Sequence, residues 1–130
     1  MRRIPIRTSQ RIELIDITAR VQEAAQGTKV SGVCLVFCPH TTAGLTINEN
    51  ADPSVVHDMR AALSKLIPEN AGYRHAEGNS DSHIKSSLFG SSVSVILENG
   101  LLMLGSWQAI YFCESDGPRQ REVWVTVTGE

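Results

Sequence analysis

Two polar segments of the chain, residues 40–52 and 75–85, carry most of the side chains whose types and spacing suit chemistry. The first follows a short apolar run and starts with His40, Thr41 and Thr42. Asn48 and Glu49 then add an amide and a carboxylate. Polar groups that follow a buried strand are a common arrangement for a binding or catalytic site. The alternative is that these side chains only satisfy a turn.

The second segment holds two histidines separated by seven residues, with acidic and amide side chains between them. If this segment is extended, the two-residue period of a strand places on one face His75, Glu77, Asn79, Asp81 and His83. Two imidazoles with carboxylates nearby suit zinc or another divalent ion. Asp81 could instead orient an imidazole from outside the coordination sphere. The alternative is a solvated polar loop, because this spacing alone is a weak signal for a metal.

A third polar group lies late in the chain, where Trp107 and Gln108 precede an apolar run and residues 114–121 contain two arginines. A guanidinium binds phosphate or carboxylate through two parallel hydrogen bonds, so Arg119 is a candidate for holding an anionic substrate. A tight turn with solvated charges explains the same residues equally well. His57 is expected to be an exposed helix residue, and the three cysteines to act as small apolar residues.

The composition of the chain limits the class of protein. The 130 residues, 42% hydrophobic and 20% charged, indicate a single globular domain over residues 1–130. A formal net charge of -2 argues against a nucleic-acid binder. The chain has no apolar run of about 18 residues, so no membrane span is expected. Three cysteines, an odd number, fit reduced thiols and hence a cytoplasmic protein.

Apolar periodicity predicts the elements that position these side chains. Helices are expected at residues 17–25 and from Pro53, which Asp52 caps, to Pro68. Residues 69–82 are expected to form a long loop. Pro5 predicts an edge strand, and Asn99-Gly100 predicts a turn. Seven strands are expected at residues 3–7, 12–15, 33–38, 92–97, 101–104, 107–113 and 122–128, and residues 45–47 could form another. Strands with segregated helices indicate an α+β fold of about seven strands and two or three helices.

These residues also resemble a known family, the YjbQ-like family, often labelled secondary thiamine-phosphate synthase. The resemblance extends over nearly the whole chain and rests on four stretches with the family's order and spacings, residues 40–53, 78–85, 104–111 and 114–119. It implies a compact β-sandwich-like core and a homotrimer. It further implies a metal site formed by His40, His75 and His83. The candidate substrate-binding residues are Thr41, Thr42, Asn48, Asn79, Lys85, Trp107, Gln108 and Arg119.

Three functions follow from these expectations. The first is a metal-dependent enzyme, with zinc as the expected ion, Glu49 or Asp81 as the base, and thiamine-phosphate synthesis as the best-named reaction. That reaction condenses a pyrimidine diphosphate with a thiazole phosphate. The second is a non-catalytic trimer that binds metal or a small phosphorylated molecule. The third is a zinc-dependent hydrolase of unknown substrate.

Overall fold

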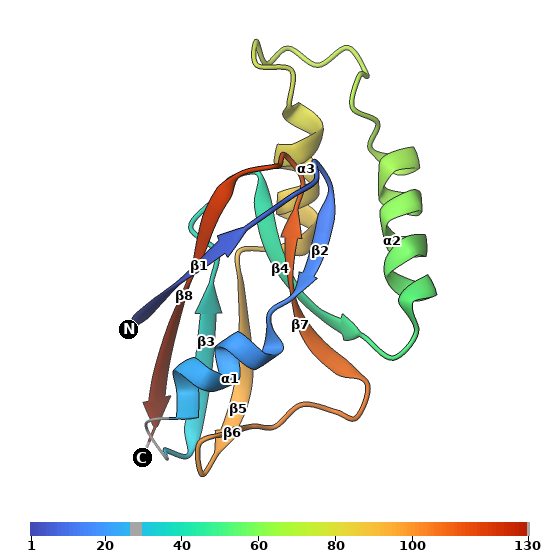
Figure 1. Ribbon diagram of the computed structural model, residues 1–130. Helices are drawn as coiled ribbons and strands as arrows, with labels where there is room; N and C mark the ends of the chain where they lie inside the picture. The colour runs from blue at the N-terminus through green and yellow to red at the C-terminus, as the bar shows by residue number, and fades with distance from the viewer. Residues whose placement is uncertain (27–29, 130) are drawn as a thin grey trace.

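The computed structural model describes residues 1–26 and 30–129, which form two antiparallel sheets and three helices (Figure 1). The larger sheet has the order β1 (Arg2–Arg7), β8 (Gln120–Gly129), β3 (Gly32–Phe37), β5 (Ser92–Glu98) and β6 (Leu101–Leu102). The smaller sheet has the order β2 (Glu13–Asp16), β7 (Gln108–Glu114) and β4 (Ala43–Glu49). The predicted α+β class is confirmed, with eight strands in the described residues in place of about seven.

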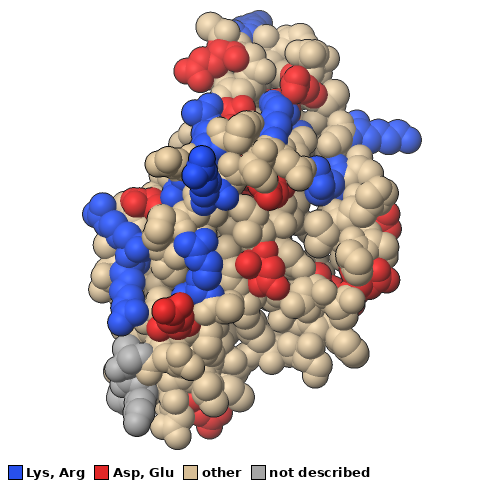
Figure 2. Space-filling model, in the orientation of Figure 1, with Lys and Arg blue, Asp and Glu red and all other residues tan. Residues whose placement is uncertain are grey.

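One main hydrophobic core joins the two sheets. Alternate residues of β1, β3 and β8 are buried, as the two-residue period of a strand requires. They meet Leu45 and Phe112 of the smaller sheet. The helix α1 (Thr18–Gln26) adds Val21 and Ala25 to the same core. Burial of this apolar surface holds the sheets in place, so the strand ends present polar residues at fixed positions. On the face shown in Figure 2, Lys and Arg side chains are interspersed with Asp and Glu.

Three local expectations agree with the structure. The Asp52 carboxylate accepts a hydrogen bond from the Ser54 amide at the start of α2 (Pro53–Leu66), which is the predicted cap. Pro5 lies on β1, an edge strand of the larger sheet, where it need not donate to a neighbour. Asn99 and Gly100 both have positive φ in the tight turn between β5 and β6.

The helix α3 (Ser80–Phe89) is the main difference from expectation. Residues 75–83 were expected to be extended or part of a loop, and the helix instead begins at Ser80. Its buried face is polar and consists of Asp81, Ser82, Lys85 and Ser86. The sequence therefore has no apolar stripe that would predict this helix, although the buried polar residues do recur with helical spacing.

A glycine lets α3 pack closely against β4. A Cβ atom at Gly44 would lie 2.7 Å from the Gly90 carbonyl oxygen and 3.0 Å from the Cβ of Phe89. The Leu45 amide donates to the Gly90 carbonyl at 3.0 Å, which fixes the end of the helix to the strand. The polar residues of α3 are thereby held beside the first residues of β4. Among residues 1–26 and 30–129, no helix combines the length and apolar character needed to cross a membrane.

Candidate functional site

The length of β4 separates the predicted site residues into two groups. His40, Thr41 and Thr42 come just before Ala43, at one end of the strand, whereas Asn48 and Glu49 lie at the other. Six steps of about 3.3 Å put roughly 20 Å between these two ends. Trp107 and Gln108 join the Glu49 end, because Glu49 pairs with Gln108 across the sheet. Within one chain, the residues at the Glu49 end therefore lie far from His40.

The group at the Glu49 end is engaged in local contacts. Asn48 accepts a hydrogen bond from the Glu49 amide at 2.8 Å. The Gln108 side chain accepts one from the Gly105 amide at 2.8 Å, and Trp107 is 64% exposed. These contacts shape the turn before β7.

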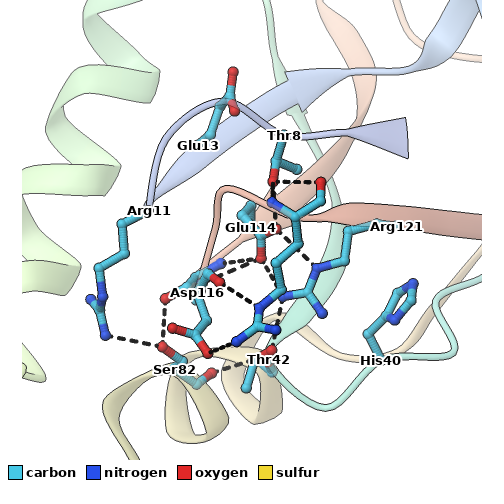
Figure 3. Close-up of polar contacts among 12 residues, drawn as sticks. Thr8, Arg11, Glu13, His40, Thr42, Ser82, Glu114, Asp116 and Arg121 are labelled. Carbon is cyan, nitrogen blue, oxygen red and sulfur yellow. Dashed lines mark hydrogen bonds and ion pairs between the residues drawn. The ribbon is translucent and has the colours of Figure 1, made fainter. Parts of the chain in front are cut away.

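At the opposite end, a buried ion pair organises the polar cluster drawn in Figure 3. Arg121 of β8 donates to both carboxylate oxygens of Glu114, at 2.9 and 2.5 Å, and to the Thr42 hydroxyl at 2.8 Å. Thr8 also donates to Glu114, at 2.7 Å. The side chains of Glu114 and Arg121 are 0% and 7% exposed. The Thr42 hydroxyl is therefore already bonded to Arg121 and helps to hold the strand ends together. The contribution of Thr8 to this cluster could not be predicted, because no motif in the local sequence points to its bond with Glu114.

A second buried cluster anchors α3. The Asp81 carboxylate accepts hydrogen bonds from Lys85 at 3.0 Å and from Arg11 at 3.0 and 3.2 Å. Arg11 also donates to the Ser82 hydroxyl (Figure 3). Burial acts to raise the pKa of Asp81, but the hydrogen bonds and positive charges of Arg11 and Lys85 outweigh it and lower that pKa below its ordinary value. Two predicted site residues, Asp81 and Lys85, thus neutralise each other inside the protein.

Asn79 and Arg119 meet at a third residue, Asp116. The Asn79 amide donates to the Asp116 carboxylate at 2.8 Å, and Arg119 donates to the same oxygen at 3.0 Å. Arg119 also donates to the Asp116 carbonyl, so its guanidinium is held in one orientation. The Oδ1 atom of Asn79 is buried and has no hydrogen-bond partner among the described residues.

His40 takes the place of a strand residue beyond the end of β3. Its Nε2 atom lies 3.0 Å from both the backbone nitrogen and the carbonyl oxygen of Glu122 on β8. In an antiparallel strand, the N–H and C=O of one residue point to the same neighbouring strand. Beside Glu122 that neighbour would be β3, but β3 ends at Phe37, so the His40 side chain meets these two groups instead. Burial lowers the pKa of His40, as does the charge of Arg121. The imidazole is therefore fixed in position and favoured in its neutral form.

Two neighbouring cavities share the ring of His83 as a wall. One, of about 420 Å³, is lined by His40, Thr41, Ala43, His83, Ser86, Ser87, Gly90 and Ser91. The other, of about 440 Å³, is lined by Tyr73, Arg74, His75, Ser80, His83 and Ile84. The rings of His75 and His83 meet edge to face, with centroids 5.4 Å apart. The structure thus brings His83 together with each of the other two predicted histidines, but in different cavities.

The expectation of a metal-dependent enzyme requires correction. Among residues 1–26 and 30–129, no group of three or more His, Cys, Asp or Glu side chains is arranged to hold a metal ion. Of the carboxylates expected near the histidines, Asp81 pairs with Lys85 and Arg11, Glu49 lies at the far end of β4, and only Glu77 approaches a histidine, at 4.0 Å from His75, among the described residues. The three-histidine centre is therefore not formed in this structure, and zinc as a cofactor stays an untested prediction.

Relatives of this chain have names that carry no activity. It is 53% identical to UPF0047 protein MJ1081 of Methanocaldococcus jannaschii over 96% of this chain and 91% of the relative. It is 50% identical to UPF0047 protein YugU of Bacillus subtilis over 99% of each chain. Neither name supports thiamine-phosphate synthesis or hydrolysis, so those predicted functions are wrong as conclusions about this protein.

Solved structures show the same fold. An uncharacterized conserved protein of the yjbq/upf0047 family from Clostridium acetobutylicum matches with a TM-score of 0.96 and 51% identity, over 98% of this chain and all of that one. A conserved hypothetical protein from Thermus thermophilus matches with a TM-score of 0.92 and 41% identity, over 98% of this chain and all of that one. The family model for UPF0047 protein YjbQ-like covers residues 2–130. The chain therefore belongs to the YjbQ-like, UPF0047 family.

Proposed function

We propose that this protein binds a small polar molecule between His40 and His83 and transfers a proton to or from it. The observation that carries the proposal is that two imidazoles, one of them held neutral, line a single cavity with four hydroxyl-bearing residues. A positioned imidazole is the side chain most often used as a general acid or base near neutral pH. The cavity volume of about 420 Å³ falls within the range of small-molecule sites.

The contact between His40 and Glu122 is compatible with either neutral tautomer of the ring. If Nε2 carries the proton, it donates to the Glu122 carbonyl, and Nδ1 is free to accept a proton from the ligand. If Nδ1 carries the proton, Nε2 accepts from the Glu122 amide, and Nδ1 donates a hydrogen bond to the ligand without giving up its proton. The tautomer with its proton on Nε2 is therefore the catalytic one: Nδ1 takes a proton from the ligand, and the imidazolium so formed can return it.

The remaining predicted residues have distinct parts in this proposal. Thr41 binds the ligand directly, because it is exposed in the same cavity. Asp81 positions His83, since its ion pair with Arg11, between β1 and β2, ties α3 to the rest of the fold, while Lys85 pairs with Asp81 within the helix. Asn48, Glu49, Trp107 and Gln108 lie beyond the far end of β4 and contribute nothing to a site built from one chain. The homotrimer and the cytoplasmic location remain separate predictions.

A conversion assay tests the proposal. A panel of small hydroxylated and carbonyl compounds is incubated with the protein in deuterated water and followed by proton NMR for conversion or deuterium uptake. His40→Gln and His83→Gln should each lower the rate by about 100-fold or more, as expected for loss of a general acid or base. His57→Gln is the matched control, because its side chain is 80% exposed on α2. Conversion that persists unchanged in His40→Gln refutes the proposal.

A further inference from the structure

The cavity beside His83 has the features of an anion subsite. It adjoins the His40 cavity at the His83 ring, so a single elongated molecule could occupy both. Arg74 lines it, exposed and without an ion pair or hydrogen bond within residues 1–26 and 30–129. The nearest carboxylate to its imidazole wall is Glu77, whose Oε2 atom lies 4.0 Å from Nε2 of His75 and which is 71% exposed. The subsite therefore contains an unpaired guanidinium, Arg74. Its nearby carboxylate, Glu77, is exposed to solvent and makes only a long contact with His75.

The walls around Arg74 are fixed and partly apolar. The Tyr73 hydroxyl donates to the Pro68 carbonyl at 3.1 Å, which restrains the half-buried ring. Ile84 of α3 is 40% exposed and supplies an apolar surface. A guanidinium beside an aromatic ring and an aliphatic side chain suits a ligand with an oxyanion at one end and C–H groups next to it.

The His40 cavity is complementary to a different chemistry. The hydroxyls of Ser86 and Ser87 donate to helix carbonyls at 2.9 and 3.0 Å, which leaves their lone pairs to accept from a ligand. The hydroxyls of Thr41 and Ser91 make no hydrogen bond within the described part of the chain, so they can donate or accept. A wall that offers both acceptors and donors suits the hydroxyl groups of a ligand, because each hydroxyl group both donates and accepts.

From these two halves we infer that the ligand is an acidic, polyhydroxylated small molecule. Its oxyanion, a carboxylate or a phosphate, binds at Arg74 and His75, and its hydroxyl groups bind at Thr41, Ser91 and the serines of α3. His83 lies between the two halves and contacts both. This inference rests on the proposed function, because it names the substrate class of the same site.

Isothermal titration calorimetry with four probes tests the inference. D-Gluconate and D-glucose 6-phosphate should bind at least about 10-fold more tightly than D-glucose or inorganic phosphate, because only the first two fill both halves. Comparison of the two acids distinguishes a carboxylate from a phosphate. Arg74→Gln should weaken binding of the preferred acid about 10- to 100-fold, the usual effect of losing hydrogen bonds to a charged group. Arg2→Gln, at an exposed position of β1, is the matched control.

The outcomes separate this inference from the proposed function. If neither acid binds at millimolar concentration, or if Arg74→Gln binds the acids as well as the wild type, the substrate class is wrong. If glucose binds as tightly as both acids, the substrate class is also wrong, but the proposed function at His40 is not contradicted. If Arg74→Gln weakens binding but His40→Gln leaves the rate of conversion unchanged, the anion subsite stands and the proposed function fails.

Discussion

Replacing Asp81 by asparagine should destabilise the fold by about 3–5 kcal/mol. The change keeps the size of the side chain and removes the charge that pairs with Lys85 and Arg11. The side chain of Lys85 is 3% exposed, so its ammonium cannot turn to water when its partner is neutral. Arg11 is 31% exposed and keeps Glu69 at 3.1 Å as a second partner, so it contributes the smaller share. An uncompensated buried Lys85 therefore dominates the cost.

A double-mutant cycle separates the ion pair from other effects of the substitution. Lys85→Met alone should cost less than Asp81→Asn, because Asp81 retains two hydrogen bonds from Arg11. In the double variant no cation at position 85 is left without a partner, so its destabilisation should be smaller than the sum of the singles by at least about 1.5 kcal/mol. The comparison of singles with the double measures the coupling directly.

Urea unfolding followed by circular dichroism gives the free energies for all four proteins. Asp81→Asn should lower the unfolding midpoint with no large change in slope, since the surface exposed on unfolding is similar. Additivity of the two single variants within about 0.5 kcal/mol would refute the reasoning, because it would mean that the buried charges do not depend on each other.

Three other predictions follow from particular contacts. Gly44→Ala should cost about 1–3 kcal/mol in the same urea assay, because its new methyl group would meet the Gly90 carbonyl at 2.7 Å; an unchanged midpoint would show that α3 can move away. In an NMR titration, the pKa of His40 should lie below 6.5. Because the unfolded state binds this proton at a higher pH than the folded state, the free energy of unfolding should fall as the pH drops below 6.5, and it should fall less in His40→Gln. A midpoint above 6.5 would contradict the neutral ring. Sedimentation equilibrium should give three times the chain mass if the homotrimer is correct, and a monomer would exclude it.

Features that depend on neighbours in the sequence could be predicted well. The Asp52-Pro53 start of α2 follows from a side-chain cap and a proline that suits the first turn. The strands β1, β3 and β8 follow from alternation between buried and exposed residues. β4 is longer than the predicted residues 45–47, because Ala43 and Gly44 are also buried and paired with β7.

The helix α3 could not be predicted from apolar periodicity. Its buried residues are an aspartate, a lysine and two serines, which in isolation look like a solvated surface. They are buried because Arg11 and a backbone carbonyl of Ser115, both distant in sequence, satisfy them. A pattern that marks only apolar residues misses a helix whose packing face is held by charge and hydrogen bonds.

The α+β class, most strand positions and the residues that mark the family could all be inferred from the chain alone, because they depend on local periodicity and residue type. The sequence also selected His40, His75 and His83 as residues worth testing. Tertiary structure decided their partners: Glu122, 82 positions from His40, fixes that ring, and the length of β4 separates Glu49 from it. The alternation of apolar residues along a strand indicates only which face of that strand is buried. Which polar side chains lie close together depends on how strands distant in the sequence pair with each other.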